Sequence, residues 1–226
     1  LPQLVAWTDD FVRCLSPTST PEQVEQGKVA ASHLVEAFQN LLGRPALDVV
    51  VANRLGYLSQ SYEATAGLIG NTIVALGRHG DVRDRAGSEP AFLTAVIREV
   101  ARHDAPIQNT RRFLGRPGTV AGQDMRAGET VLVVLAAANR DPAANLDPDR
   151  FDPHRRERLT FTFGLGAHAC PGETLATIVT QAGVEQLLAA RLDFAGVLGT
   201  LAYRPSGNAR IPLFGPRPGG PPVTSH

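Results

Sequence analysis

The chain has 226 residues, 43% of them hydrophobic, and its 22 lysine and arginine residues balance its 22 aspartate and glutamate residues. This length is enough to bury a substantial core, and the neutral charge balance argues against a nucleic-acid partner. No apolar run approaches the length of a membrane span and no signal peptide is visible, so we expect a cytoplasmic protein without a membrane partner. The two cysteines do not make a disulfide framework.

Apolar periodicity and helix-end signals predict a mainly helical chain. Helices are expected over residues 4–15, about 20–42, about 48–76, 90–103 and from residue 171 to about 190. The second helix has the clearest start, because Thr20, Pro21 and Gln23 match a capping box with proline in the first turn. Cys14 is expected in the core of the first helix, and residues 16–20 and 77–89 are expected to be loops.

Extended structure is predicted only in the second half of the chain. Short strands are expected within residues 107–136, including 130–135, followed later by a closing hairpin over 204–213 and a loose Pro/Gly-rich tail over 215–226. The expected fold class is therefore mainly α with minor β (α+β), and residues 1–226 are expected to form a single unit.

One glycine-rich loop, residues 163–172, carries the chemistry of the chain. Cys170 lies near its end, directly before an apolar helical pattern. Gly164 and Gly166 permit backbone with positive φ, so that amide N–H groups can turn towards the sulfur. Pro171 is expected in the first turn of the helix, whose positive end favours a thiolate. This arrangement suits an exposed cysteine that binds iron.

The loop resembles the haem-binding loop of the cytochromes P-450. The shared pattern is Phe-Gly-x-Gly-x-His-x-Cys-x-Gly, followed here by Leu175-Ala176. The resemblance implies a cytochrome P-450 fold and one haem b (iron protoporphyrin IX), with Cys170 as the iron ligand. The cofactor-binding residues that it implies in and after the loop are Phe163, Gly164, Gly166, His168, Gly172 and Ala176.

The motifs upstream of the loop follow the order found in the same family. Glu99 and Arg102 are three residues apart on a predicted helix, which places them on one helix face as an ion pair. An Asn-Arg-Asp-Pro turn and the segment 147–152 come next. The resemblance gives Glu99 and Arg102 a structural role, in which they tie this segment to the cysteine side of the core. Arg155 is expected to complete their network.

Two basic residues are expected to hold the haem propionates. Arg112 lies thirteen residues after Glu99, where the family has a propionate-binding arginine, and a planar guanidinium suits a carboxylate. Arg111 is the neighbouring candidate, but strand alternation turns it the other way. His168 matches the position of a second propionate donor.

The distal helix departs from the family pattern Ala-Gly-x-acid-Thr. In the matching stretch, residues 60–64, Glu63 keeps the acid, Gln60 replaces a small residue and Ala64 replaces the threonine. Thr65 is one step further, about 100° around the helix, and the register that restores it misplaces Glu63. We expect Gln60, Glu63 and Ala64 at the catalytic face. Proton delivery by Gln60, delivery by a substrate hydroxyl, and a less conventional oxidation all stay open. So does ordinary monooxygenation in which Gln60 only contacts the haem or the substrate.

The resemblance also implies a function and partners. It indicates a bacterial haem-thiolate oxidoreductase that oxidises a small, natural-product-like organic substrate, with electrons from a ferredoxin and a ferredoxin reductase. The chain has no counterpart of the N-terminal half of the family fold, so that half or another chain is expected to complete the haem pocket. The alternative is a non-catalytic haem-binding or partner-binding remnant. The expected substrate contacts are Ile107, Gln108, Asn109, Thr110 and Asn208.

Overall fold

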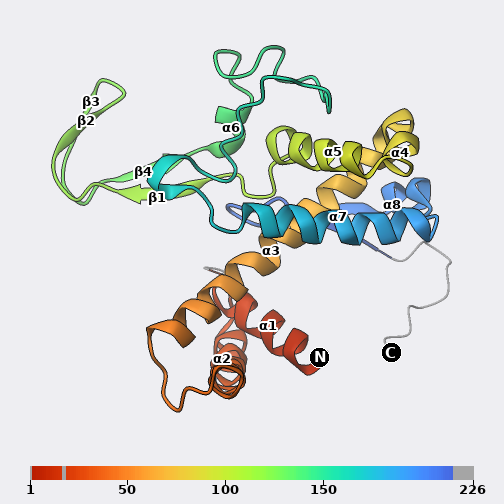
Figure 1. Cartoon of the computed structure of the whole chain (residues 1–226). Coiled ribbons are helices and arrows are strands. Elements are labelled where there is room, and N and C mark those ends of the chain that lie inside the picture. The colour runs from red at the N-terminus through yellow and green to blue at the C-terminus, as the bar shows by residue number, and fades with distance from the viewer. Residues whose placement is uncertain (1, 17–18, 216–226) are drawn as a thin grey trace. The chain divides into compact units, whose positions relative to one another are not determined.

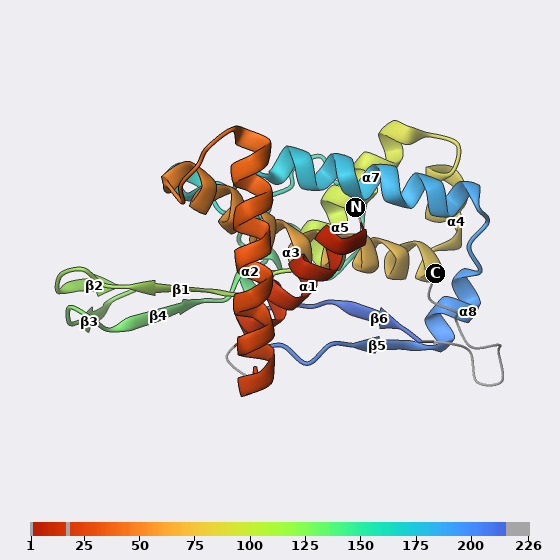
Figure 2. The same cartoon turned by 90° about the horizontal axis from the view of Figure 1, so that it is seen from below.

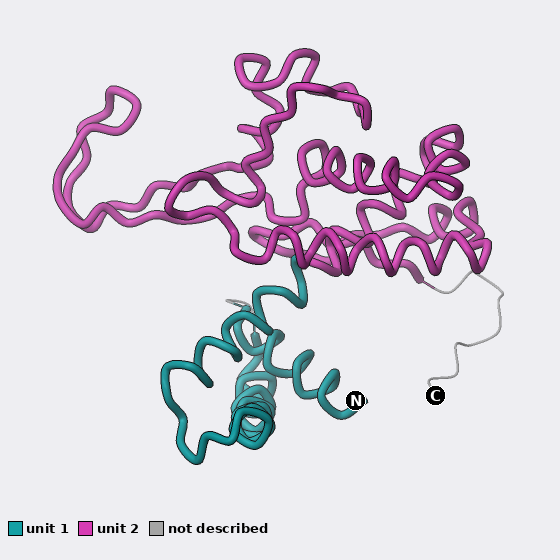
Figure 3. Tube along the Cα trace, viewed as in Figure 1, with its two compact units in different colours: residues 1–64 teal, residues 65–226 magenta. Residues whose placement is uncertain are grey.

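The computed structural model describes residues 2–16 and 19–215, so the expected tail lies outside the described residues except for residue 215, and the expected loop 16–20 is described only in part. The chain divides into two compact units, residues 1–64 and 65–226 (Figure 3). Helix α3 (Val49–Arg78) runs through this boundary. The expectation that residues 1–226 form a single haem-binding unit stays a prediction.

Unit 1 contains helices α1 (Pro2–Cys14) and α2 (Pro21–Leu42) and the first part of α3. The predicted capping box is confirmed: the Gln23 N–H donates to Thr20 Oγ1 at 3.2 Å, and the Thr20 N–H donates to Gln23 Oε1 at 2.9 Å. Helix α2 ends at Gly43, whose φ of 62° closes the helix in the left-handed region. Helix α2 therefore begins and ends where its own residues predict.

Helices α1 and α2 pack closely at two points. The rings of Trp7 and His33 stack with their centroids 4.6 Å apart. Further along, Gly27 faces Cys14 so closely that a Cβ on Gly27 would lie 2.2 Å from the Cys14 Cβ. Glycine at position 27 is thus required by the distance between the helices. Cys14 is half-buried at this contact, in keeping with its expected place on the packed face of α1.

Unit 2 consists of helices with three small sheets (Figures 1 and 2). After α3 its helices are α4 (Gly80–Ala86), α5 (Pro90–His103), α6 (Leu135–Asn139), a 3₁₀ turn (Gly166–His168), α7 (Glu173–Ala189) and α8 (Phe194–Gly199). Its strands are β1 (Thr110–Phe113), β2 (Gly118–Val120), β3 (Gln123–Met125), β4 (Thr130–Val133), β5 (Leu201–Tyr203) and β6 (Pro212–Phe214). The pairs β1–β4, β2–β3 and β5–β6 are antiparallel, and the β2–β3 hairpin forms the tip of the β1–β4 ribbon (Figure 2). The predicted fold class, mainly α with minor β, is confirmed.

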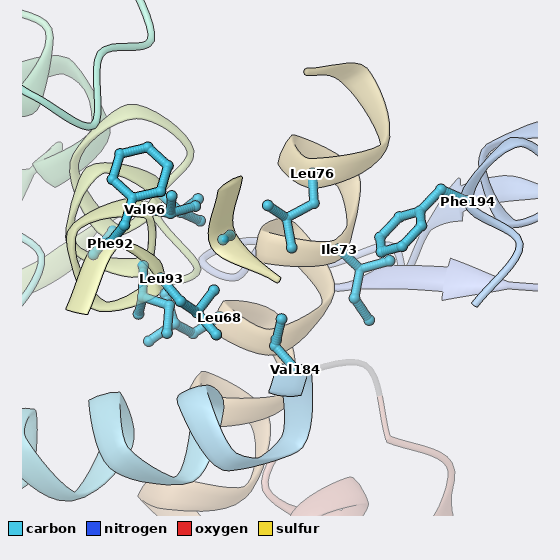
Figure 4. Close-up of a cluster of buried hydrophobic side chains, with 12 residues drawn as sticks. Leu68, Ile73, Leu76, Phe92, Leu93, Val96, Val184 and Phe194 are labelled. Carbon is cyan, nitrogen blue, oxygen red and sulfur yellow. The ribbon is translucent and has the colours of Figure 1, made fainter. Parts of the chain in front are cut away.

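Helix α5 is the centre of the unit 2 core (Figure 4). Leu93, Val96, Ile97 and Val100 recur at helical spacing and are all at most 1% exposed. They pack with side chains from the neighbouring helices, among them Leu68, Ile73 and Leu76 of α3, Val184 of α7 and Phe194 of α8. Burying several such side chains, each worth about 1.5–3 kcal/mol, makes α5 a rigid base for the residues on its other positions.

The predicted secondary structure was wrong at three short helices, which the sequence analysis had assigned to loops or strands or had not assigned. The expected loop 77–89 contains α4, because Val82 and Ala86 of this polar stretch pack against the core. The expected strand 130–135 stops at Val133, since Leu135 already begins α6. Helix α8 was not predicted at all. In each case tertiary contacts stabilise a helix that is too short to form alone.

The closing hairpin is displaced from its predicted bounds of 204–213. Its strands are β5 and β6, and the segment between them turns back so that Ala209 forms a β-bridge with Ile107. The hairpin loop is therefore long. The Arg204 N–H donates to the Ile211 carbonyl across it, and its residues 208–210 also pair with the segment that follows α5.

Gly27→Ala is expected to destabilise unit 1 by about 1–3 kcal/mol, because the added methyl group overlaps Cys14. Gly56→Ala in α3 is the control, since nothing lies within 4 Å of its Cβ position, and it should stabilise by about 0.5–1 kcal/mol through helix propensity. Urea unfolding followed by the fluorescence of Trp7, the single tryptophan, measures both variants. Equal stabilities for the two variants would show that α1 and α2 do not pack at Gly27.

Candidate functional site

Cys170 is an exposed thiol at the end of a tightly closed loop. The Cys170 N–H donates to the Phe163 carbonyl at 2.6 Å, which joins the two ends of the loop. The Gly172 N–H points at the sulfur and lies 3.4 Å from Cys170 Sγ. A sulfur that is exposed and accepts a backbone N–H is suited to bind a metal as a thiolate.

The shape of this loop depends on its glycines. Gly164 has a φ of +69°, and a Cβ at this position would lie 2.6 Å from the His168 carbonyl oxygen. Gly166, with a φ of +62°, begins the 3₁₀ turn that carries His168. The positive φ values agree with the sequence argument. The N–H group that reaches the sulfur, however, belongs to Gly172.

Helix α7 begins slightly later than predicted. Pro171 was expected in the first helical turn, but Gly172 is the N-cap and Glu173 the first helical residue, so Pro171 precedes the helix. The cysteine still lies two residues before the N-cap, at the positive end of the helix. Ala176 is half-buried one turn into α7, while Leu175 next to it is 61% exposed.

The two expected propionate ligands have no acidic partner among the residues that the structure describes. Arg112 lies in β1, and its Nη1 donates to Thr110 Oγ1 at 3.0 Å and to the Arg111 carbonyl at 2.9 Å. Since β1 is extended, Arg112 shares one face of the ribbon with Thr110, and Arg111 lies on the other face with the exposed Phe113. His168 is exposed in the 3₁₀ turn. Both side chains are therefore available to a carboxylate ligand.

Glu99 and Arg102 form a completely buried ion pair on α5. Arg102 Nη2 donates to Glu99 Oε1 at 2.7 Å and Arg102 Nε donates to Glu99 Oε2 at 3.1 Å, and both side chains are 0% exposed. The remaining Arg102 donors reach the carbonyls of Asn139, Pro148 and Arg150 at 2.8–3.1 Å. The pair thus fixes the end of α6 and the irregular segment after it to α5.

Two further arginines lie at the same carboxylate. Arg155, the member predicted from sequence, has its Nε 3.6 Å from Glu99 Oε1, but its hydrogen bonds go to the carbonyls of residues 146, 147 and 150. Arg158, which the sequence argument missed, donates from Nε to Glu99 Oε2 at 2.9 Å. The only available signal was another arginine three residues after Arg155, and spacing in an irregular segment does not predict direction.

The ionisation of Glu99 reflects this environment. Burial by itself raises the pKa of Glu99, but the hydrogen bonds from Arg102, the Asp152 N–H and Arg158 outweigh it, and the pKa is held below the usual value of a glutamate. The carboxylate is therefore charged, as the three surrounding guanidinium groups require.

The expected substrate residues come together next to the sheets. The Gln108 N–H donates to the Asn208 carbonyl at 2.7 Å, and Asn109 Nδ2 donates to the Gly207 carbonyl at 2.9 Å. With the Ile107–Ala209 bridge, these contacts join the segment before β1 to the long hairpin loop. The structure thus brings these residues together, while their contact with a substrate stays a prediction.

Gln60, Glu63 and Ala64 lie on α3 in the last residues of unit 1. Gln60 is exposed, and Glu63 and Ala64 are half-buried. They share one helical turn, as their spacing predicts. Because the cysteine loop belongs to unit 2, the relation of these residues to Cys170 stays a prediction.

Within the described residues, no helix has both the length and the apolar character needed to cross a bilayer.

A long helix leading into a helical core, a buried Glu–Arg pair and an exposed cysteine in a glycine loop are the features that the resemblance to the cytochromes P-450 predicted. The comparisons with known proteins give the family. Residues 54–190 match the cytochrome P-450 family model, and the chain belongs to this family.

Similar proteins are bacterial members of the family. The chain is 35% identical over 182 residues to the vitamin D(3) 25-hydroxylase of Pseudonocardia autotrophica, a match that covers 77% of this chain and 45% of that protein. It is 31% identical over 206 residues to the cytochrome P-450 monooxygenase PikC of Streptomyces venezuelae, covering 84% of this chain and 50% of that protein. The chain therefore spans about half the length of these relatives.

Solved structures give the same fold. The crystal structure of P450BioI in complex with an acyl carrier protein ligated to hexadec-9Z-enoic acid has a TM-score of 0.76 and 25% sequence identity. The similarity covers 93% of this chain and 60% of that chain. The expected cytochrome P-450 fold is confirmed for the portion that the chain spans.

Glu99→Gln is expected to cost about 3–5 kcal/mol at neutral pH, because it leaves the buried Arg102 without its counter-charge. The pKa of Glu99 is lowered in the folded chain, so its contribution is complete above the unfolded value of about 4.3 and is lost as the pH falls through the folded value. The difference in urea-unfolding free energy between wild type and variant should therefore shrink in acid.

The control is Glu89→Gln, which removes an exposed ion pair with Arg85 and should change stability little. A difference between wild type and Glu99→Gln that stays constant from neutral to acid pH would contradict the assignment of a charged Glu99.

Proposed function

We propose that the chain supplies the cysteine side of a haem-thiolate oxidoreductase of the cytochrome P-450 monooxygenase type. The single observation that carries the proposal is the exposed Cys170 Sγ, which accepts the Gly172 N–H at the N-terminus of α7. Family membership makes haem b the expected cofactor. When bound, a thiolate-ligated haem iron supplies dioxygen activation for the oxidation of an organic substrate.

The side chains of unit 2 suit a haem. Cys170 offers an exposed sulfur ligand, and its loop requires glycine at position 164, where a Cβ would lie 2.6 Å from the His168 carbonyl oxygen. Arg112 and His168 are exposed and have no acidic partner among the described residues, so we assign them to the two propionates. Phe163 and Ala176 are the apolar contacts of the macrocycle in this proposal.

Proton handling is assigned to α3. Glu63 offers a carboxyl group, Gln60 offers an amide donor one turn away, and Ala64 leaves the threonine position without a hydroxyl. In this proposal Gln60 or a hydroxyl of the substrate donates the hydrogen bond that the missing threonine does not. The reaction is then a monooxygenation with an atypical distal site.

The substrate class is a small, natural-product-like molecule. The relatives whose names state a function include a vitamin D(3) 25-hydroxylase and a 6-deoxyerythronolide B hydroxylase, and these names support an organic substrate. The residues assigned to contact it, in the joined segments before β1 and between β5 and β6, are Ile107, Gln108, Asn109, Thr110 and Asn208. In this proposal a ferredoxin and a ferredoxin reductase supply the electrons.

One alternative function remains for this family member. The chain spans 45% of its vitamin D(3)-hydroxylating relative, and in the catalytic proposal the N-terminal half of the fold or another chain completes the haem pocket. A non-catalytic haem-binding or partner-binding remnant needs no such completion. Turnover of the reconstituted, haem-loaded protein with peroxide or with a ferredoxin system separates the two.

Cys170→Ala is expected to abolish the thiolate spectrum of the reduced carbon monoxide complex, because it removes the sulfur ligand. The control is Cys14→Ala, which changes a half-buried cysteine in unit 1 and should leave the spectrum unchanged. Visible absorption of the haem-reconstituted chain measures both. A thiolate spectrum that persists without Cys170 would refute the proposal.

Arg112→Ala is expected to weaken haem retention by up to about 1.5–3 kcal/mol, the value of one hydrogen bond to a charged group. Arg111→Ala is the matched control, since it removes an exposed arginine from the opposite face of the same strand. Haem transfer to apomyoglobin gives the loss rates. Identical rates for the two variants would reject Arg112 as the propionate ligand.

A further inference from the structure

The segment that enters the cysteine loop is held by asparagine side chains. Residues 159–162 are not part of a strand or a helix, and their backbone groups need partners where they pass the core. Two asparagines supply them. Asn145 is 1% exposed and Asn139 is 0% exposed, so neither has access to water.

Both polar atoms of the Asn145 side chain form hydrogen bonds with the backbone of one residue, Leu159. Its Oδ1 accepts the Leu159 N–H at 3.1 Å, and its Nδ2 donates to the Leu159 carbonyl at 2.9 Å. The same Nδ2 lies 3.2 Å from the Asn139 carbonyl. The amide group thus takes the place of a neighbouring strand at Leu159.

Asn139 continues this pairing two residues further on. Its Oδ1 accepts the Phe161 N–H at 2.7 Å, and its Nδ2 donates to Thr162 Oγ1 at 2.8 Å. Thr162 Oγ1 in turn donates to the Ala101 carbonyl on α5 at 2.6 Å. The segment is therefore fastened to the same rigid helix that carries the buried Glu99–Arg102 pair.

Residues 159–162 lead directly into the cysteine loop, and the backbone carbonyls at this junction close the loop. The Phe161 carbonyl accepts the Gly164 N–H at 2.9 Å, and the Phe163 carbonyl accepts the Cys170 N–H at 2.6 Å. Fixing residues 159–162 fixes the Phe161 carbonyl, which holds the Gly164 N–H. The Phe163 carbonyl belongs to the same planar peptide group as that N–H, so it is held as well, and it accepts the Cys170 N–H. Hydrogen bonds and this peptide group thus connect Asn139 and Asn145 to the cysteine.

We infer that Asn145, acting with Asn139, is a positioning residue for the Cys170 thiolate. The Asn145 side chain bonds Leu159 and Asn139 and not the sulfur. Asn145 acts by setting the direction in which the backbone enters the cysteine loop. The consequence for the iron ligand rests on the proposed function. The consequence for the loop itself does not depend on a bound haem.

Asn145→Leu replaces the amide by an apolar group of similar size and removes both hydrogen bonds to Leu159. Amide hydrogen exchange of the peptide covering residues 159–172, read by mass spectrometry, is expected to become about tenfold faster or more, because two hydrogen bonds are lost. The peptide covering the buried part of α5 reports global unfolding in the same sample and gives the baseline.

Asn71→Leu is the matched control. Asn71 is also 0% exposed in unit 2, and its Nδ2 donates to the Asp104 and Arg210 carbonyls, away from the loop. It should lower overall stability through the loss of these two hydrogen bonds without accelerating residues 159–172 beyond the α5 baseline. The inference is overturned if Asn145→Leu accelerates this peptide no more than Asn71→Leu does.

The reconstituted protein provides a second readout. In the reduced carbon monoxide complex, Asn145→Leu should convert part of the thiolate spectrum to the form seen with a neutral sulfur ligand, and Asn71→Leu should not. Unchanged spectra with altered exchange would overturn the role in ligand positioning. If wild type binds no haem, the proposed function fails, and the exchange measurement still decides whether Asn145 positions the loop.

Discussion

The buried charge of Glu99 is the constraint on which the rest of unit 2 depends. A carboxylate without water is stable only when hydrogen-bond donors surround it, and here Arg102, Arg158 and the Asp152 N–H do so. To supply these donors, the irregular segment after α6 must fold back on α5. Because Arg102 also takes the carbonyls of Asn139, Pro148 and Arg150, the ion pair determines the course of a segment with little regular secondary structure.

The cysteine loop differs from the buried Glu99 cluster because its functional side chain is exposed, yet it also depends on the unit 2 core. Cys170 is exposed, and its geometry comes from glycines with positive φ and a few short backbone hydrogen bonds. Such a loop has few apolar contacts of its own, so it is rigid only if its entry and exit are fixed. Buried asparagines fix the entry, and α7 fixes the exit. The Cys170 sulfur is thereby fixed in position by its backbone while it stays exposed.

Much of this was predictable where the information is local. The capping box at Thr20, the extent of α5, the positive φ of Gly164 and the position of Cys170 before a helix are set within a few residues of chain. The short helices α4, α6 and α8 were missed because their stability comes from contacts with the core. Arg158 was missed for a related reason: its direction is decided by a carboxylate 59 residues away in the chain.

The sequence by itself determined the family, the iron-ligand candidate and the Glu99–Arg102 pair, since each rests on residue types at fixed local spacing. Only the tertiary structure decided which arginine completes the buried cluster, which N–H reaches the sulfur, and that Asn139 and Asn145 carry the segment into the loop. The physical reason is the same for all three. Hydrogen-bond partners of buried groups are chosen by direction and burial across distant parts of the chain, and one-dimensional spacing contains neither quantity.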